Sequence, residues 1–333
     1  MKCTRDDQRD FVDEIVRYHG REENTHALLT GLKSGDAPVA RLCLRLLLDH
    51  PQFSHHSLFD LAMCQQDPVV RHHITQFILS RPEDVSSEIL IRLLADRFAP
   101  VKQQALQYVQ DHHLNLAKET VKRLMLDNNS LVRQRACRLY QSHHGDPLAV
   151  YLAAFDDAGS RPALRKAALL GLDELRYPQV ITLAESIPLA SPFGLYFAAL
   201  NLIVKHKGDD ARELLIALLT NAEPAVARAA RRIILRQKLL VTLTDLQCCL
   251  AHAPSSEHAL LAYSLAHRLN KWDWLIFLMR NATDETQALT QQAIAEWQSY
   301  FNRSATEPSA AQREQLAAFL TASRYAHLQH FLR

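Results

Sequence analysis

A short motif recurs at an almost constant distance along this chain of 333 residues. It consists of a polar break, often with a proline, followed by an apolar residue and usually a basic one. The apolar residues, taken as origins, are Ala40, Val70, Val101, Val132, Leu164, Leu195 and Val226. Successive origins lie 30, 31, 31, 32, 31 and 31 residues apart. Such a period indicates a repeat fold, in which each unit packs mainly against its neighbours.

Each origin opens a segment with apolar residues at offsets four, seven and eight, as in Val132, Ala136, Leu139 and Tyr140. This spacing predicts a helix with one buried face. The offset-four residue is alanine in five repeats, which lets two helix axes approach closely. A second, shorter amphipathic segment lies between these helices, for example at 88–96. The unit is therefore a helix, a turn and a helix, and neighbouring units must stack to cover their apolar faces.

Composition supports a helical protein and excludes several classes. Only 8 glycines occur, whereas β-rich and α/β folds use glycine in many tight turns. The formal charge of +2 gives no electrostatic reason to expect nucleic-acid binding. The six cysteines show no CxxC spacing, and we interpret them as reduced core residues of a cytoplasmic protein. We expect no membrane span, because the longest apolar region, 180–204, contains Glu185, Pro188 and Pro192.

The repeats predict one domain over 1–333. Residues 1–25 form an N-terminal cap with an acidic helix near Asp6 to Tyr18, and 26–240 hold the regular repeats. Residues 241–333 hold degenerate repeats and an aromatic C-terminal cap. Its aromatic cluster, which includes Trp272, Trp274 and Trp297, is either the cap of the core or a docking site for a partner.

The 31-residue unit, with an aspartate in the turn and Val-Arg opening the second helix, resembles the short HEAT repeats of bacterial proteins, the PBS-lyase HEAT-like alpha-solenoids. The resemblance covers about residues 26 to 300. It implies an all-α fold, a right-handed alpha-alpha superhelix of about nine two-helix repeats with capping helices. In this family the turn aspartate and the helix-opening cation form a ladder between repeats. The candidates here are Asp36/Arg41, Asp67/Arg71, Asp96/Lys102, Asp127/Arg133 and Asp157/Arg165.

In HEAT-like stacks the second helices line the concave surface, so offsets two, three and six should face the groove. The predicted partner-binding residues are His72, His73, Gln76, Gln103, Gln107, Gln134, Arg135, Arg138, Lys166, Asn201, Arg228 and Arg232. This stripe is rich in amides and cations and contains no carboxylate. We therefore expect a groove wall without acids, suited to a polar or acidic partner surface.

The sequence contains no nucleotide-binding glycine loop, nucleophile elbow or metalloprotease helix motif. Several of the 17 histidines form adjacent pairs, such as His72-His73 and His143-His144, and neighbours on a helix point in different directions. We interpret the histidines at helix ends as cations beside the negative end of the helix dipole. We thus expect no catalytic residue, no metal and no cofactor.

Two main functions remain open, because the repeat architecture supports many activities. The leading hypothesis is a non-catalytic protein-binding scaffold or inhibitor, and one version is an immunity protein that neutralises a bacterial toxin. The alternative is a DNA-binding repair enzyme that resembles the HEAT-like alkyl-base glycosylases and would hold DNA in a basic groove. A chaperone role towards a pigment is a third possibility, but no particular residue supports it.

Overall fold

A computed structural model describes residues 22–48, 54–157, 159–283, 286–321 and 325–332. These residues form helices and no strands, which confirms the all-α prediction. The expected acidic helix near Asp6 to Tyr18 lies outside the described residues. The chain divides into two compact units, Met1–Tyr177 and Pro178–Arg333, which are called unit 1 and unit 2 below.

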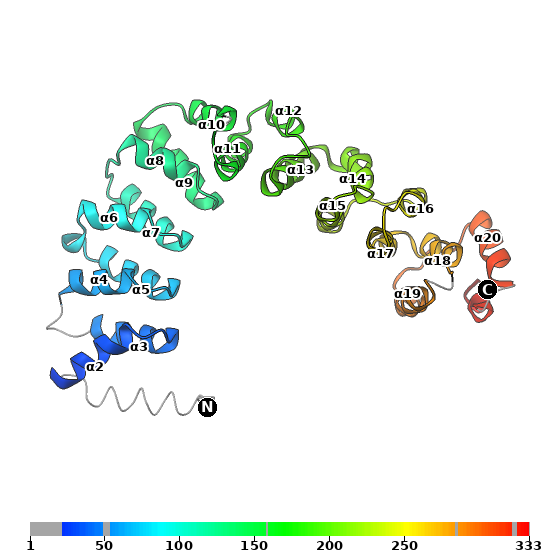
Figure 1. Cartoon of the computed structure of the whole chain (residues 1–333), viewed down its shortest axis with the longest axis horizontal. Helices are drawn as coiled ribbons and strands as arrows, with labels where there is room; N and C mark the ends of the chain where they lie inside the picture. Colours follow the sequence, from blue (N-terminus) through cyan, green and yellow to red (C-terminus); the bar gives the residue numbers. More distant parts are fainter. Residues whose placement is uncertain (1–21, 49–53, 158, 284–285, 322–324, 333) are drawn as a thin grey trace. The chain divides into compact units, whose positions relative to one another are not determined.

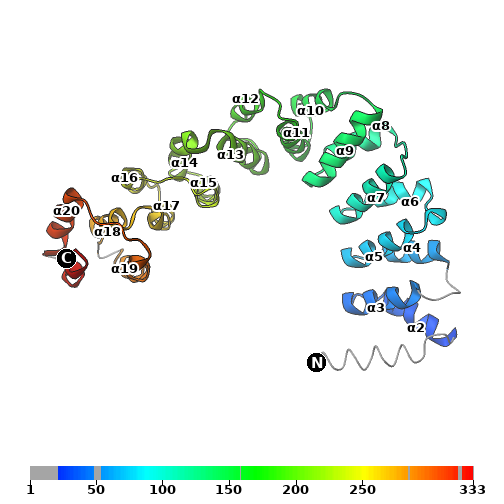
Figure 2. The same ribbon diagram turned by 180° about the vertical axis from the view of Figure 1, so that it is seen from behind.

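Unit 1 consists of consecutive helices that pack in pairs. The first helices of the pairs are α2 (Glu22–Leu32), α4 (His55–Met63), α6 (Ser87–Leu94), α8 (Lys118–Met125) and α10 (Pro147–Asp156). The second helices are α3 (Ala37–Leu48), α5 (Pro68–Leu79), α7 (Ala99–Asp111), α9 (Ser130–His143) and α11 (Pro162–Glu174). A short 3-10 helix, η1 (Pro82–Asp84), precedes α6. Figures 1 and 2 show α3, α5, α7 and α9 in one layer and α2, α4, α6 and α8 in the other.

Unit 2 repeats the paired arrangement. Its first helices are α12 (Val180–Glu185), α14 (Arg212–Leu219), α16 (Leu243–Ala251) and α18 (Lys271–Arg280), and its second helices are α13 (Phe193–Lys207), α15 (Pro224–Gln237), α17 (Ser256–Tyr263) and α19 (Gln287–Tyr300). The last α-helix, α20 (Ala310–Thr321), packs on α18. Short 3-10 helices are η2 (Gly208–Ala211), η3 (Ala266–Arg268), η4 (Phe301–Arg303) and η5 (Ala326–Leu332).

The recurring motif begins the second helices by ordinary capping chemistry. In α5 the side chain of Asp67 accepts a hydrogen bond from the Val69 amide, while Pro68 occupies the first turn, where its missing amide proton is not needed. Asn129 caps α9 in the same way through the Val132 amide. At their other ends, α7, α11 and α15 are each followed by a residue with positive φ, which turns the chain out of the helix.

The predicted helical face forms the core. Six of the seven origins are buried, with exposed fractions of 5% or less, and so are the alanines at offset four, such as Ala136. The exception is Leu164 at the start of α11, which is 36% exposed. The prediction that this origin is buried is therefore wrong, although Ala168 and Leu172 on the same helix are fully buried.

A ladder of ion pairs joins successive repeats of unit 1. Each cation reaches the aspartate of the next repeat, and the rungs are Arg41–Asp67, Arg71–Asp96 and Lys102–Asp127. The Arg71 and Asp96 side chains are both 4% exposed, so this rung lies inside the protein. Arg71 also donates to the carbonyl oxygens of its own turn, which satisfies the rest of its guanidinium.

The fourth rung differs from the expected pattern. Arg133 pairs with Glu174 at the end of α11 and not with Asp157. The Asp157 carboxylate instead accepts hydrogen bonds from the Gly159 amide and the Ser160 hydroxyl, which close its own turn. This change coincides with the only 32-residue separation between origins, because the turn after α10 carries the additional residue.

The aromatic residues of unit 2 form a core at its C-terminal end. Trp272, Trp274 and Trp297 are 3%, 5% and 0% exposed. The Trp297 ring contacts Trp272, Phe301 and Phe331, and its indole nitrogen donates to the Lys271 carbonyl. This burial supports the cap over the docking site, because a docking surface would expose these rings.

Two further sequence expectations concern membranes and cysteines. No helix within the described ranges is long and apolar enough to span a bilayer. Among the described cysteines, Cys43, Cys137 and Cys249 are buried and free. Cys64 and Cys248 are also free but exposed, so the prediction that the cysteines are core residues is wrong for these two: Cys64 lies in the turn after α4, and Cys248 lies on the solvent side of α16.

Candidate binding surface on the second helices

The predicted partner-binding residues all keep some surface exposed to solvent, and they divide between the two units. Unit 1 carries His72, His73 and Gln76 on α5, Gln103 and Gln107 on α7, Gln134, Arg135 and Arg138 on α9, and Lys166 on α11. Unit 2 carries Asn201 on α13 and Arg228 and Arg232 on α15. Six of the residues in unit 1 line two hollows that share helix α9.

The first hollow lies over α5, α7 and α9 and has a volume of 510 Å³. Four predicted residues line it: Gln76, Gln103, Gln107 and Arg135. Gln104, at offset three from Val101, faces the hollow as predicted, and the lining residues outside the three predicted offsets are Leu79, Ser80, Tyr108, Asp111 and His112. Three successive second helices thus contribute side chains to one polar hollow, which is what the repeat period predicts for equivalent offsets.

Several donors of this hollow are already engaged within the protein. The Gln103 amide nitrogen donates to Asn129 at 3.0 Å, and the Gln107 amide nitrogen donates to the Asp111 carboxylate at 2.6 Å. Arg135 donates to the main-chain carbonyl of Gln103 at 2.6 Å. The buried Gln104 Oε1 has no hydrogen-bond partner among the described residues. The hollow therefore keeps amide oxygens of its glutamines together with the remaining N–H groups of Arg135, so it suits polar partner groups that donate and accept hydrogen bonds.

The second hollow lies between α9 and α11 and has a volume of 320 Å³. Gln134 and Arg138 line it, together with Cys137, Tyr151 and Glu174. Glu174 is the carboxylate that receives the Arg133 guanidinium, so its charge is compensated. Arg138 is exposed, and its guanidinium makes no hydrogen bond or ion pair within the described part of the chain. Arg138 is thus available to an acidic group of a partner.

Burial controls the chemistry of the two ionisable groups in the floor of this hollow. It raises the pKa of the Cys137 thiol, and it raises the pKa of the Tyr151 hydroxyl. A nucleophilic cysteine needs a lowered pKa, which gives the thiolate at neutral pH. The Cys137 environment therefore does not activate the thiol for covalent catalysis.

The expectation of a wall without carboxylates is wrong. Asp111 lines the first hollow and Glu174 lines the second. Both stand at offset ten from their origins, Val101 and Leu164. Because a helix turns about 100° per residue, offset ten points between offsets three and six and belongs to the same face. This position could have been read from the sequence.

Other predicted residues of unit 1 lie outside the two hollows. His72 packs edge-on against Phe98, and burial lowers its pKa, with a smaller contribution from the neighbouring His73. Its Nδ1 is buried without a hydrogen-bond partner in the described residues. His73 is exposed and Lys166 is partly exposed. These side chains continue the polar surface but do not form part of either hollow.

The predicted residues of unit 2 make contacts that reduce their capacity for a partner. The Asn201 side chain donates to the Phe197 carbonyl one turn earlier in α13, at 2.6 Å. Arg228 forms an ion pair with Glu257 on α17. Arg232 is exposed on α15. In unit 2 the cationic stripe is therefore partly neutralised by a carboxylate from the next helix pair.

The histidines that the structure describes show no metal-binding arrangement. No group of three or more histidine, cysteine, aspartate or glutamate side chains is placed to hold a metal ion in the described ranges. His112 and His144 directly follow α7 and α9, and their rings contact those of Tyr108 and Tyr140 in a tilted arrangement, with ring centroids 4.1 and 5.4 Å apart. These positions agree with the interpretation that they lie beside the helix dipole.

The sequence matches no protein-family model, and no curated protein is significantly similar to it.

Proposed function

We propose that this chain is a non-catalytic protein-binding scaffold or inhibitor of the HEAT-like alpha-solenoid type. In this proposal the repeats form a right-handed superhelix, and the second helices hold a polar or acidic surface of a protein partner. The observation that carries the proposal is the pair of adjacent polar hollows joined by α9. Preformed surfaces built from successive repeats are how solenoids bind extended partners.

The two hollows define the chemistry of the partner more closely than the stripe of cations does. The first presents amide oxygens and the Asp111 carboxylate beside the remaining N–H groups of Arg135, so it fits polar groups such as amides and hydroxyls. The second presents the unpaired Arg138, which fits a carboxylate. The proposed partner surface is therefore polar, and its acidic group lies opposite Arg138.

A specific form of the proposal is an immunity protein that binds and neutralises a bacterial toxin in the cytoplasm. Its support is the resemblance to bacterial HEAT repeats, together with cysteines that are free throughout the described chain. Occlusion of a toxin requires a large rigid surface and no catalytic group, and the buried, unactivated Cys137 agrees with this requirement.

DNA binding receives less support from the same surface. A groove for a phosphate backbone needs clustered, uncompensated cations. Here Asp111 lies in the hollow that contains Arg135, and Glu257 neutralises Arg228. The three tryptophans are buried at the end of unit 2 and are not available to stack on a base.

The test combines cross-linking with charge reversal. A photo-activated cross-linker replaces Gln76, an exposed residue of the first hollow, and the partner trapped in the native host is identified and purified. Arg138→Glu should then weaken binding of this partner by about tenfold or more, because the charge opposite its acidic group is reversed. Arg97→Glu is the matched control, since Arg97 is also an exposed arginine of unit 1 but lies outside both hollows.

Two results would contradict the proposal. One is a partner protein that binds the Arg138→Glu variant as tightly as the wild type. The other is a trapped nucleic acid whose affinity falls steeply as salt rises, which is the signature of phosphate contacts.

A further inference from the structure

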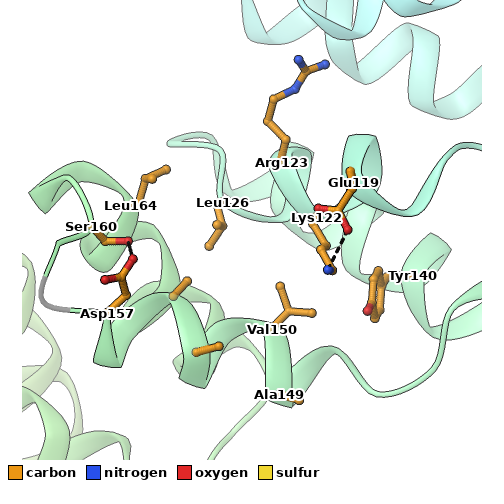
Figure 3. Close-up of a pocket in the computed structure, with 12 residues that line it drawn as sticks. Glu119, Lys122, Arg123, Leu126, Tyr140, Ala149, Val150, Asp157, Ser160 and Leu164 are labelled. Carbon is orange, nitrogen blue, oxygen red and sulfur yellow. Dashed lines mark hydrogen bonds and ion pairs between the residues drawn. The ribbon is translucent and has the colours of Figure 1, made fainter.

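A separate cleft lies beside the first helices of unit 1. It has a volume of 670 Å³, and its lining comes from α8, α10, the turn after α10, and single residues of α9 and α11. Figure 3 shows Leu126, Val150 and Leu164 around its apolar centre, with Lys122 and Asp157 on different sides. None of its lining residues belongs to the two polar hollows.

Helix α10 is more apolar than a helix with one solvent-exposed face usually is. Its sequence, Pro-Leu-Ala-Val-Tyr-Leu-Ala-Ala-Phe-Asp, is apolar on all sides. A surface helix normally has one apolar face, and a helix that is apolar all round is normally buried. Tyr151 and Phe155 are buried, at 1% and 4% exposure, and Tyr151 packs so closely on α11 that only glycine fits at Gly171. The opposite face, with Val150 and Ala153, remains open to the cleft.

Leu164, which lines the same cleft, is unusually exposed for its position in the repeat. The equivalent residue is buried in the six other repeats, with 5% exposure or less, whereas Leu164 is 36% exposed and lines the cleft. The 32-residue separation and the altered fourth rung occur in this repeat as well. Three departures from the repeat pattern therefore occur in one repeat, and this repeat leaves apolar surface uncovered.

The rims of the cleft carry opposite charges. On α8, Lys122 is paired with Glu119, and Arg123 is exposed without a partner in the described structure. On the other side is Asp157, which takes no part in the ion-pair ladder and accepts a hydrogen bond from the Ser160 hydroxyl (Figure 3). Asp157 thus places a negative charge across the cleft from Lys122 and Arg123, so the two rims differ in the sign of their charge.

The dimensions and side chains fit a helix. The α10 wall contains Ala149, Ala153 and Ala154, and small side chains allow another helix to approach closely. With 10 residues, α10 is about 15 Å long, enough to contact nearly three turns of a partner. An apolar trough with charged rims is the arrangement by which amphipathic helices are recognised in grooves.

We propose that this cleft binds one amphipathic helix of a partner protein. The contact face of that helix carries small and medium apolar residues. Its acidic flank lies against Lys122 and Arg123, and its basic flank lies against Asp157. This site is distinct from the polar hollows on the second helices, so it gives the protein a second binding surface.

The test selects helical peptides from a displayed library in which the apolar face and both flanks vary, with the full chain as the target. Selected peptides should carry acids on one flank, and they should bind Ala153→Glu at least about tenfold more weakly than wild type, because a carboxylate then stands in the apolar trough. Ala217→Glu is the matched control, an exposed alanine near the end of α14 in unit 2. Ala153 is exposed, so the variant should retain the wild-type melting temperature.

A second variant tests the polarity of the cleft. Arg123→Glu should weaken the selected peptides and strengthen versions with exchanged flanks, whereas Arg97→Glu should change neither. The proposal is overturned if no helical peptide is enriched, if enriched peptides bind Ala153→Glu like wild type, or if Arg123→Glu has no effect. It is also overturned if the wild type forms a dimer that Ala153→Glu dissociates, because the occupant is then a second copy of this chain.

Discussion

The two units connect their helix pairs by different interactions. In unit 1 the ladder Arg41–Asp67, Arg71–Asp96 and Lys102–Asp127 ties each repeat to the next, and at the fourth rung Glu174 replaces the turn aspartate. In unit 2 the C-terminal pairs are joined by the buried rings of Trp272 and Trp297 and the half-buried rings of Phe301 and Phe331. The ion pairs Lys207–Glu185, Arg212–Asp245, Arg228–Glu257 and Arg313–Glu307 of unit 2 are partly or fully exposed to solvent.

The same arrangement of helix pairs is therefore held together by two kinds of interaction, and each kind places different limits on the exposed helix faces. Ion pairs are directional, so each rung in unit 1 fixes the position of a turn and leaves the outer helix faces free to vary. Aromatic packing stabilises through buried area and tolerates irregular helix spacing. Both polar hollows and the helix cleft lie in unit 1, the unit in which turns are fixed by ion pairs.

The largest expected effect concerns the aromatic core of unit 2. Trp297→Ala removes a fully buried ring and should lower the free energy of unfolding by about 4 to 5 kcal/mol. Hydrogen exchange followed by mass spectrometry should show the loss of protection in α18, α19 and η5. Protection of the ladder helices α5 and α7 should stay unchanged. Equal loss in both units would show that the two units unfold as one, which would remove the basis of the comparison.

Next comes the buried rung of unit 1. Asp96→Ala leaves the Arg71 guanidinium, whose side chain is 4% exposed, without its carboxylate. We expect a loss of about 3 kcal/mol in the free energy of unfolding, because the buried charge becomes unpaired. Chemical denaturation measures the change, and hydrogen exchange should place it in α5 to α7.

A double variant and an exposed pair serve as controls for that rung. Arg71→Met combined with Asp96→Leu should recover most of the stability, since it removes both buried charges. Asp60→Ala breaks the exposed Arg92–Asp60 pair and should cost less than about 1 kcal/mol. If Asp96→Ala costs no more than Asp60→Ala, the ladder does not hold the repeats of unit 1 together.

The helices and most of the core were predictable from the sequence, because the positions of Val132, Ala136 and Tyr140 report the phase of a helix directly. The phase of the helix also defines which residues share a face, so the position of Asp111 on the groove face could have been predicted from its offset of ten. The pairing of Arg133 with Glu174 could not have been predicted, because helical periodicity contains no information on the distance between two helices. The cleft was hidden for the same reason, although the 32-residue step marked its repeat.

The smallest expected effect is the pH dependence of the most exposed rung. The Arg41 guanidinium, by its hydrogen bond, holds the pKa of the Asp67 carboxyl below its usual range. In the window between this lowered pKa and the ordinary value near 4, the unfolded chain binds more protons than the folded one. Asp67 therefore contributes stability that is complete above about pH 5 and is lost as the pH falls through its folded pKa.

Asp67→Asn separates this charge effect from helix capping. Asparagine keeps the side-chain oxygen that accepts from the Val69 amide at the start of α5, so the cap remains while the carboxylate is removed. Unfolding measured from pH 7 down to pH 3 should show a shallower acid loss in Asp67→Asn than in wild type. Arg41→Met should flatten the profile only in part, because the Val69 amide and Arg71 still lower the pKa of Asp67, and adding Arg41→Met to Asp67→Asn should change the profile little further. An unchanged acid profile in Asp67→Asn would mean that this outer rung contributes no charge-dependent stability, and the more buried rungs Arg71–Asp96, Lys102–Asp127 and Arg133–Glu174 would then distinguish unit 1 from unit 2.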